Sequence, residues 1–326
     1  FSRRSPADWG NPQPPDDEAA GFVLLSCPEQ GIYGSMIEIA DTGSGKSHRD
    51  ENFPVASILA PRHRAPVMCF YNFVRAADDI SDHPTLSGDQ KLALLDRLDD
   101  ALMGVGPDED VATRLRSICE ERGLDRQHAR DLLVAFRRDV TKLRYENWDE
   151  LIDYCRYSAM PVGRFVLDVH GENAARTWPA NDALCAALQV INHLQDCGKD
   201  YQALNRVYLT HDALAAHGAT VEMLTAPRAP EPLRATIRDL NEKTAHLLDD
   251  SRPFADLIDD TRLAMNVGAI QALAEELVAR LRVADPLSEK VHAGKLGFAL
   301  TGARGAFAAL ARRIMRPRRL AMDATQ

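Results

Sequence analysis

The chain has 326 residues, of which 45% are hydrophobic and 27% charged, so it can bury one large core or two modest ones. Aromatic residues make up only 6% and β-branched runs are short, which favours helices over a sheet-rich fold. The net charge of −9 argues against a nucleic-acid partner, because phosphate backbones are bound by an excess of Lys and Arg. No stretch approaches the roughly 18 consecutive apolar residues that a membrane span needs.

Residues 1–43 predict a flexible N-terminal extension, because prolines stand among Gly, Asp and Asn without a sustained period. Its end overlaps the run 40–47, ADTGSGKS, which fits a permissive phosphate-binding P-loop and follows a strand-like segment. A P-loop must open a helix, however, and HRDENFP follows here. We therefore interpret 40–47 as a Gly-Ser turn rather than a nucleotide site.

The six cysteines form no C-x-x-C pair, and most lie in apolar stretches of helical period. This usage is typical of reduced, buried thiols. We expect a cytoplasmic protein without disulfides.

From residue 55 onward, segments of helical period alternate with short Gly or Pro breaks and predict one all-α domain over residues 44–300. Asn147 precedes one segment and Glu150 stands three residues later, a capping-box arrangement with Asn in place of Ser or Thr. No repeat of fixed period is evident, which argues against a helical solenoid. The predicted helices span residues 55–82, 87–103, 108–122, 126–143, 149–169, 180–199, 211–217, 231–250, 255–283 and 287–315.

Two clusters place aspartates four residues apart inside segments that otherwise resemble buried helix: Asp78 and Asp82 with Asp79 between them, and Asp196 and Asp200. Like charges at this spacing repel by about 0.2–0.5 kcal/mol, so the pattern favours a cation between them. A lone Asp-x-x-x-Asp usually lies on a solvated helix face. Two copies in apolar helices favour a metal site, and Mg²⁺ suits carboxylate oxygens together with substrate phosphates.

Each cluster belongs to a longer polar stripe with helical spacing. Neighbouring basic residues can neutralise phosphate charge. The alternatives are that Tyr71 and Tyr154 are core aromatics and that Arg75 is a structural partner of Asp78 or Asp79, a role that can coexist with phosphate binding. We interpret His193 as a packed or partly exposed histidine rather than a catalytic base. The two stripes are Tyr71, Arg75, Asp78 and Asp82, and Gln189, Asn192, Asp196 and Asp200; the basic residues are Arg75, Lys199 and Arg206.

Three motifs in this order resemble the squalene and phytoene synthase family: FYNFVRAADDISD at 70–82, YCRYSAMPVGR at 154–164 and QVINHLQDCGKD at 189–200. With ENFPVAS at 51–57 and RVYL at 206–209, the resemblance narrows to the hydroxysqualene-forming branch of bacterial hopanoid biosynthesis. It covers about residues 44–285, within the domain predicted above.

The resemblance implies an isoprenoid-synthase-like helical bundle around a central apolar cavity, with two aspartate-rich Mg²⁺ sites. It leaves open whether Asp79 is a ligand or a neighbour of the ligands. The implied metal-binding residues are Asp78, Asp79, Asp82, Asn192, Asp196 and Asp200. The implied catalytic residues are Tyr71, Arg75, Tyr154, Asn192 and Arg206, and the implied substrate-binding residues are Ser57, Arg75, Gln189, Lys199, Arg206 and Tyr208.

The implied reaction converts presqualene diphosphate and water to hydroxysqualene and diphosphate, between enzymes that supply the substrate and consume the product. Gln195 stands where the wider family commonly has Arg. The site therefore has one basic residue fewer, which is compatible with binding one diphosphate rather than two. No G-x-G-x-x-G follows a strand, so we expect no nicotinamide. The alternatives are a synthase that condenses two prenyl diphosphates and a non-catalytic partner subunit of such an enzyme.

The C-terminal segment 301–326 is basic and amphipathic, in contrast to the acidic chain as a whole. It favours contact with anionic phospholipid at the inner face of the cell membrane. The alternative, a solvated terminal helix that ends at Pro317, is equally compatible with the sequence.

Overall fold

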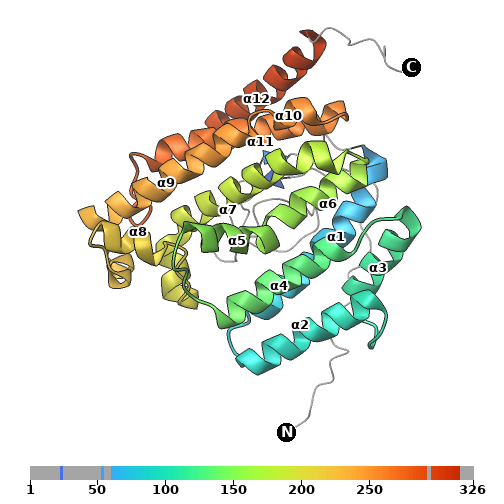
Figure 1. Cartoon of the computed structure of the whole chain (residues 1–326), viewed down its shortest axis with the longest axis horizontal. Helices are drawn as coiled ribbons and strands as arrows, with labels where there is room; N and C mark the ends of the chain where they lie inside the picture. Colours follow the sequence, from blue (N-terminus) through green and yellow to red (C-terminus); the bar gives the residue numbers. More distant parts are fainter. Residues whose placement is uncertain (1–22, 25–52, 55–59, 292–294, 316–326) are drawn as a thin grey trace.

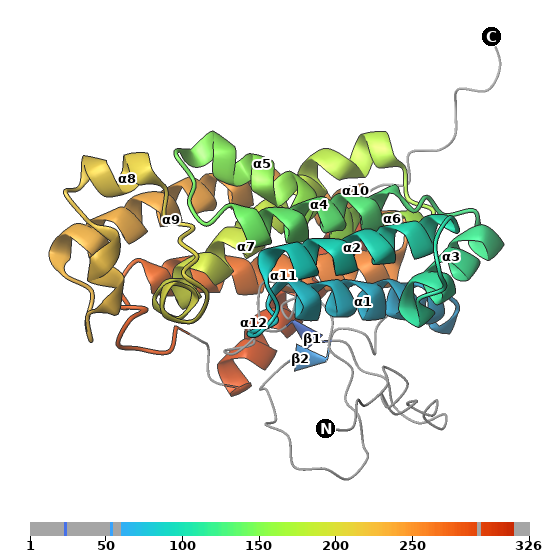
Figure 2. The ribbon, with the colours of Figure 1, turned by 90° about the horizontal axis from the view of Figure 1, so that it is seen from below.

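The computed structural model describes residues 23–24, 53–54, 60–291 and 295–315. Within them the chain is almost entirely helical, which confirms the predicted all-α class (Figures 1 and 2). The helices are α1 Pro61–Ser81, α2 Gly88–Met103, α3 Asp110–Arg122, α4 Gln127–Thr141, α5 Trp148–Ser158, α6 Met160–His170, α7 Ala174–Leu204, α8 His211–Ala216, α9 Glu231–Ser251, α10 Phe254–Leu257, α11 Thr261–Leu281 and α12 Lys295–Met315, with a 3-10 turn η4 Val221–Thr225. Two short antiparallel strands, β1 Val23–Leu24 and β2 Phe53–Pro54, pair with each other.

Local capping explains several helix boundaries. The predicted cap at Asn147 is confirmed, because its Oδ1 accepts from the backbone N–H of Glu150 at 3.0 Å and α5 begins at the next residue. The Glu150 carboxylate completes a different bond, to the N–H of Glu146 rather than of Asn147. Ser87 and Gln90 form a full reciprocal capping box at the start of α2.

Four predicted segments were wrong at their boundaries; one of them, 287–315, forms a helix only from Lys295. The segment 149–169 divides at Ala159 into α5 and α6, because Pro161 in the first turn of α6 has no N–H to continue the α5 hydrogen-bond ladder. The segment 255–283 divides before Asp260, whose side chain caps α11 by accepting from Leu263 N–H. The segment 180–199 is part of the longer α7, which runs for 31 residues and continues through Pro179.

The long helix α7 lies in the middle of the bundle and packs against α5, α6, α9 and α11 (Figure 1). On the other side, α1 packs against α2, α3, α4 and α6. Phe70 of α1 stacks on Phe165 of α6 with ring centroids 4.0 Å apart. Gly163 lets α6 approach α7 closely, since a Cβ there would lie 2.0 Å from Asn181 Oδ1. The two aspartate-bearing helices, α1 and α7, are thus held in one core through α6.

The C-terminal helix α12 packs along α11 at one edge of the bundle (Figure 1). The two helices cross at glycines: a Cβ at Gly305 would lie 2.2 Å from the carbonyl oxygen of Gly268. The predicted boundary between residues 300 and 301 therefore falls inside a packed helix. The predicted extension 1–43 and the run 40–47 lie outside the described residues, apart from Val23–Leu24.

We expect Gly305→Ala to lower the free energy of unfolding by about 1–3 kcal/mol, because its methyl group must separate α11 from α12. Gly297 provides a matched control in the same helix, since a Cβ there would meet no atom within 4 Å. Gly297→Ala should instead stabilise by about 0.4–1 kcal/mol. Urea unfolding followed by circular dichroism measures both, and equal effects would contradict the close crossing.

Candidate active site

The first aspartate cluster lies at the C-terminal end of α1. Asp78 is only 4% exposed, and Arg75 Nη1 lies 3.1 Å from its Oδ2. The other Arg75 nitrogen, Nη2, lies 3.2 Å from Oδ1 of the exposed Asp79. Arg75 therefore pairs with both Asp78 and Asp79, the two structural partners that the sequence suggested, and the two carboxylates share one guanidinium group.

Burial raises the pKa of Asp78 well above its usual range, and the neighbouring carboxylate of Asp82 raises it further. Arg75 opposes the shift without cancelling it. A carboxylate in this position is stabilised in its ionised form by any additional cation. A buried carboxylate of this kind could therefore hold a cation.

The second cluster lies near the C-terminal end of α7. Asn192 and Asp196 are buried at 9% exposure, and Lys199 Nζ lies 2.9 Å from Asp196 Oδ1. Burial raises the pKa of Asp200 to about 7; Arg206 opposes this shift, and Asp82 adds to it. Asp82 is the C-cap of α1, and Arg206 links it to the second cluster: its backbone N–H donates to the carbonyl of Asp200 at 3.1 Å, and its side chain reaches Asp82.

Arg206 joins the two clusters through the turn that ends α7. Asn205 has a positive φ of 53°, a conformation that Asn tolerates better than most residues, and Arg144 Nη2 donates to its Oδ1 at 2.8 Å. The turn directs Arg206 back toward α1, where Nη1 lies 2.7 Å from Asp82 Oδ1. Although burial acts in the opposite direction, the carboxylates of Asp139 and Asp82 raise the pKa of Arg206. Arg206 is thus a permanently charged, buried contact between the two halves of the site.

Asp139 on α4 is a site residue that the sequence motifs did not reveal. It is 4% exposed and accepts hydrogen bonds from the hydroxyl of Tyr154 at 2.9 Å and of Tyr208 at 3.3 Å. Its backbone carbonyl accepts from Arg206 Nε. Burial raises the pKa of Asp139 to about 6, while Arg206 and the two hydroxyls oppose this shift. A carboxylate in the apolar face of α4 was the feature of the sequence that could have indicated Asp139. Its partners could not be predicted, because they are distant in sequence.

An aromatic group surrounds Asp139. Tyr154 is fully buried, and the His193 ring stacks on Tyr208 with centroids 3.4 Å apart. Burial lowers the pKa of His193 well below its usual value, so the ring is neutral near pH 7. Its Nε2 lies 3.1 Å from the amide nitrogen of Gln189. His193 is therefore a packed histidine, as its preferred interpretation predicted, and Tyr154 and Tyr208 face a carboxylate from within the core.

The other residues predicted for the site have fewer contacts with the two carboxylate clusters. Tyr71 is half-buried against the core, and Ser57 lies outside the described residues. Gln195 turns away from the carboxylates, because its amide donates to the carbonyl of Val291 at 2.5 Å. In this chain, position 195 links α7 to the segment after α11. Lys91 on α2 is a further basic residue near Asp82, and its Nζ donates to the carbonyl of Ser81 at 2.8 Å.

The site contains more carboxylates than basic groups. The described residues contain no group of three His, Cys, Asp or Glu side chains arranged to chelate one ion by themselves. With all six carboxylates ionised, four basic side chains would leave two surplus negative charges, and a bound cation would favour that ionised state. Mg²⁺ suits such a donor set, because it is held by a few carboxylates with substrate phosphates. The carboxylates are Asp78, Asp79, Asp82, Asp139, Asp196 and Asp200, and the basic residues are Arg75, Lys91, Lys199 and Arg206.

Asp139→Asn should change how stability depends on pH. The pKa of Asp139 is raised in the folded state, so the folded chain binds more protons than the unfolded chain between about pH 4 and 6. Its contribution to stability therefore falls as pH rises through this window, by about 2–3 kcal/mol. We expect the difference in unfolding free energy between wild type and Asp139→Asn to fall by this amount in urea titrations at pH 4, 5, 6 and 7. A difference independent of pH would contradict the raised pKa.

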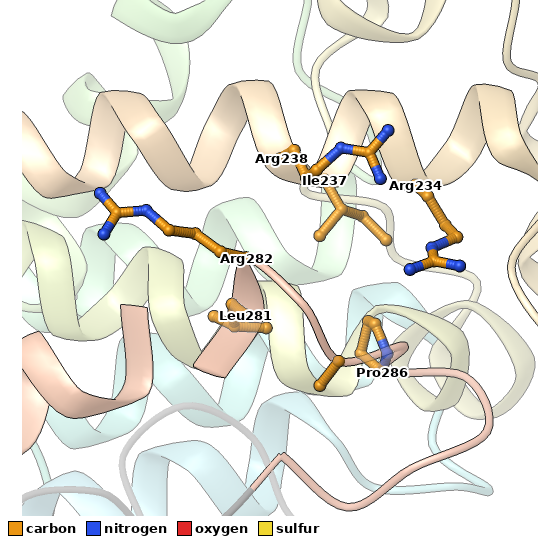
Figure 3. Close-up of a pocket in the computed structure, with 7 residues that line it drawn as sticks. Arg234, Ile237, Arg238, Leu281, Arg282 and Pro286 are labelled. Carbon is orange, nitrogen blue, oxygen red and sulfur yellow. The ribbon is translucent and has the colours of Figure 1, made fainter. Parts of the chain in front are cut away.

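A separate depression lies between α9 and the end of α11 (Figure 3). Figure 3 shows three arginines around it, but two are neutralised: Arg238 pairs with Glu231, and Arg282 with Glu242 at 2.8 Å. Arg234 donates to the carbonyl of Val283 at 3.5 Å. Its basic groups therefore already have protein partners, and the carboxylate site is the stronger candidate for function.

Comparison with known proteins identifies the class of this site. The family model of squalene/phytoene synthase matches residues 46–296, which include both aspartate clusters, and the chain belongs to this family. The hydroxysqualene synthase of Rhodopseudomonas palustris is 54% identical over 282 residues, which cover 86% of this chain and 95% of that protein. The hydroxysqualene synthase of Zymomonas mobilis is 52% identical over 268 residues, covering 80% and 90%.

A solved structure agrees with this family. Squalene synthase HpnC from Alicyclobacillus acidocaldarius has a TM-score of 0.62 and 32% identity, covering 70% of this chain and 86% of that one. The resemblance found from the three sequence motifs is thereby confirmed at the level of family and fold.

Proposed function

We propose that the protein is a hydroxysqualene synthase, which converts presqualene diphosphate and water to hydroxysqualene and diphosphate. The observation that carries this proposal is the convergence of the α1 and α7 carboxylates around Arg206, with 2.7 Å between Arg206 and Asp82. Relatives that bear this name share more than half of their aligned residues with the chain and are covered over nearly their whole length. The family assignment defines a synthase, and these relatives support the particular substrate.

Mg²⁺ is the proposed cofactor, and when bound it would neutralise the diphosphate leaving group. Asp78, Asp82, Asp196 and Asp200 would hold it with Asn192. Their surplus of negative charge and the raised pKa of Asp78 support this assignment. Asp79 is exposed and paired with Arg75, so we assign it the role of a neighbour that positions the guanidinium group.

Basic side chains would bind the substrate diphosphate at the same place. Arg75, Lys199 and Arg206 each lie against a carboxylate of the site and can exchange to phosphate oxygens as the diphosphate enters. Arg206 is the most buried of them, and its charge is therefore the least screened by water. Ser57 and Gln189 remain proposed substrate contacts.

The reaction breaks the C–O bond between the presqualenyl carbon and diphosphate, and the bonding electrons leave with diphosphate. The resulting cyclopropylcarbinyl cation rearranges, a water oxygen forms the new C–O bond, and that water loses one proton to the medium. Tyr71 and Tyr154 would stabilise positive charge through their ring faces. Tyr208 would orient Tyr154 through their shared partner, Asp139. No reductant enters this balance.

A second candidate function is the condensation of two prenyl diphosphates. Position 195 supports the single-diphosphate reaction instead, because Gln195 is neutral and already bonded to Val291. Incubation of the purified protein and Mg²⁺ with presqualene diphosphate or farnesyl diphosphate, without reductant, separates the two. We expect hydroxysqualene from presqualene diphosphate alone. Presqualene diphosphate or a hydrocarbon from the linear substrate would assign a condensing enzyme, and no product from either would favour a partner subunit.

We propose a cytoplasmic position at the inner face of the cell membrane, between an enzyme that supplies the prenyl diphosphate and one that consumes the alcohol. Both substrate and product are lipids, which supports exchange with a bilayer. Among the described helices, none has a stretch long and apolar enough to cross a membrane.

A further inference from the structure

The outward face of α12 carries a continuous apolar stripe. Eight large apolar side chains are strongly exposed among the described residues, and five of them belong to this helix. Leu296, Leu300, Phe307 and Ile314 are separated by four, seven and seven positions, so they fall within about 40° of one another around the helix axis. These four, the α12 stripe, and the nearby Met315 have exposed fractions between 62% and 75%. A contiguous apolar surface of this kind marks a binding face.

The α12 stripe is held in place rather than frayed. The opposite face of α12 carries Gly305 and the buried Ala309, which pack on α11 at Gly268. Near the C-terminal end, Arg312 Nε lies 3.2 Å from Asp256 Oδ1, and Arg313 donates to the backbone carbonyl of Ile258. One face of the helix is therefore fixed to the bundle, while the other presents apolar side chains outward.

Charge indicates the kind of partner. Residues 295–319 contain seven Lys or Arg and no Asp or Glu, although the whole chain has a net charge of −9. Two copies joined symmetrically through this face would bring two such basic segments together. An anionic bilayer surface would instead accept the apolar side chains and attract the net positive charge of this segment.

We propose that α12 binds the surface of an anionic phospholipid bilayer through the α12 stripe, with the exposed Arg304 beside the stripe facing the headgroups. The proposed function enters this inference only as the reason for membrane binding, which is the exchange of a lipid substrate and product. It assigns the membrane contact to particular side chains. Figure 1 shows that the C-terminal part of α12 projects past α10, so the bundle itself leaves this end accessible.

The test is vesicle flotation of the full-length protein, without substrate or Mg²⁺. Vesicles of equal parts phosphatidylglycerol and phosphatidylcholine are compared with vesicles of phosphatidylcholine alone. We expect wild type to float with the anionic vesicles, less so in high salt. The double variant Leu300→Ser/Phe307→Ser should bind at least tenfold more weakly. The matched control Val105→Ser/Val283→Ser removes two apolar side chains of comparable exposure (79% and 74%) outside α12 and should bind as wild type does.

A wild-type protein that does not float with anionic vesicles would overturn the inference, as would unchanged binding by the α12 variant. Light scattering tests self-association: an oligomer that only the α12 variant loses, without vesicle binding, would assign the stripe to a second copy. If the double variant failed to fold, Phe307→Trp would replace it, with a blue shift of its fluorescence expected only on anionic vesicles. Flotation is independent of turnover, so a protein that binds vesicles but makes no hydroxysqualene would overturn the proposed function alone.

Discussion

Asp78→Asn and Asp196→Asn should each lower kcat by about 10³-fold while the protein remains folded. Each change removes one anionic oxygen donor from the proposed magnesium site and leaves the shape of the side chain unchanged. Asp78 is buried beside Asp82, and its carboxylate is costly to ionise without an added cation. Loss of this charge should therefore leave the free energy of unfolding unchanged or raise it by about 1 kcal/mol in the absence of Mg²⁺.

The measurement combines turnover of presqualene diphosphate across a Mg²⁺ titration with thermal unfolding in a metal chelator. The two variants should require higher Mg²⁺ for their residual activity. Asp110→Asn is a suitable control, because Asp110 is 71% exposed and its pair with Arg114 contributes little. Full activity in either site variant would contradict the metal site, and a large loss of stability in chelator would assign these carboxylates a structural role.

Arg206→Gln should destabilise the protein by about 3–5 kcal/mol, the cost of leaving buried carboxylates without their counter-charge. Arg206 is the contact between α1 and α7 through Asp82, and it also offsets the raised pKa values of Asp139 and Asp200. Activity should fall as well, because the same guanidinium group is proposed to bind diphosphate. Urea unfolding at pH 7 measures the first effect directly.

A double-mutant cycle separates the pair from its surroundings. Asp82→Asn combined with Arg206→Gln should recover about 0.5–3 kcal/mol relative to the sum of the single changes. Arg114→Gln, which removes one partner of an exposed pair, should cost no more than about 1 kcal/mol. Additive effects of Asp82→Asn and Arg206→Gln would mean that the 2.7 Å contact does not stabilise the fold.

The helices were predictable where local physics decides them. Asn147 caps α5 because its side chain reaches an N–H only three residues away, and such a contact is encoded in the sequence. The division at Ala159 depends on Pro161. This proline is evident in the sequence, but the helical period continues on both sides of it, and we therefore predicted one helix. The close crossing of Gly268 and Gly305 was not predictable, because it depends on how α11 and α12 pack and not on the period of either helix.

The aspartate clusters illustrate the same division within the site. Spacing by itself determined that Asp78 and Asp82 share a face of one helix, and that Asp196 and Asp200 share a face of another. Only the tertiary structure decided that Asp139 accepts hydrogen bonds from the hydroxyls of both Tyr154 and Tyr208. It also decided that the turn at Asn205 directs Arg206 to its ion pair with Asp82. Periodicity specifies the face of each helix, whereas contacts between helices depend on how their surfaces pack, and packing is a property of the whole chain.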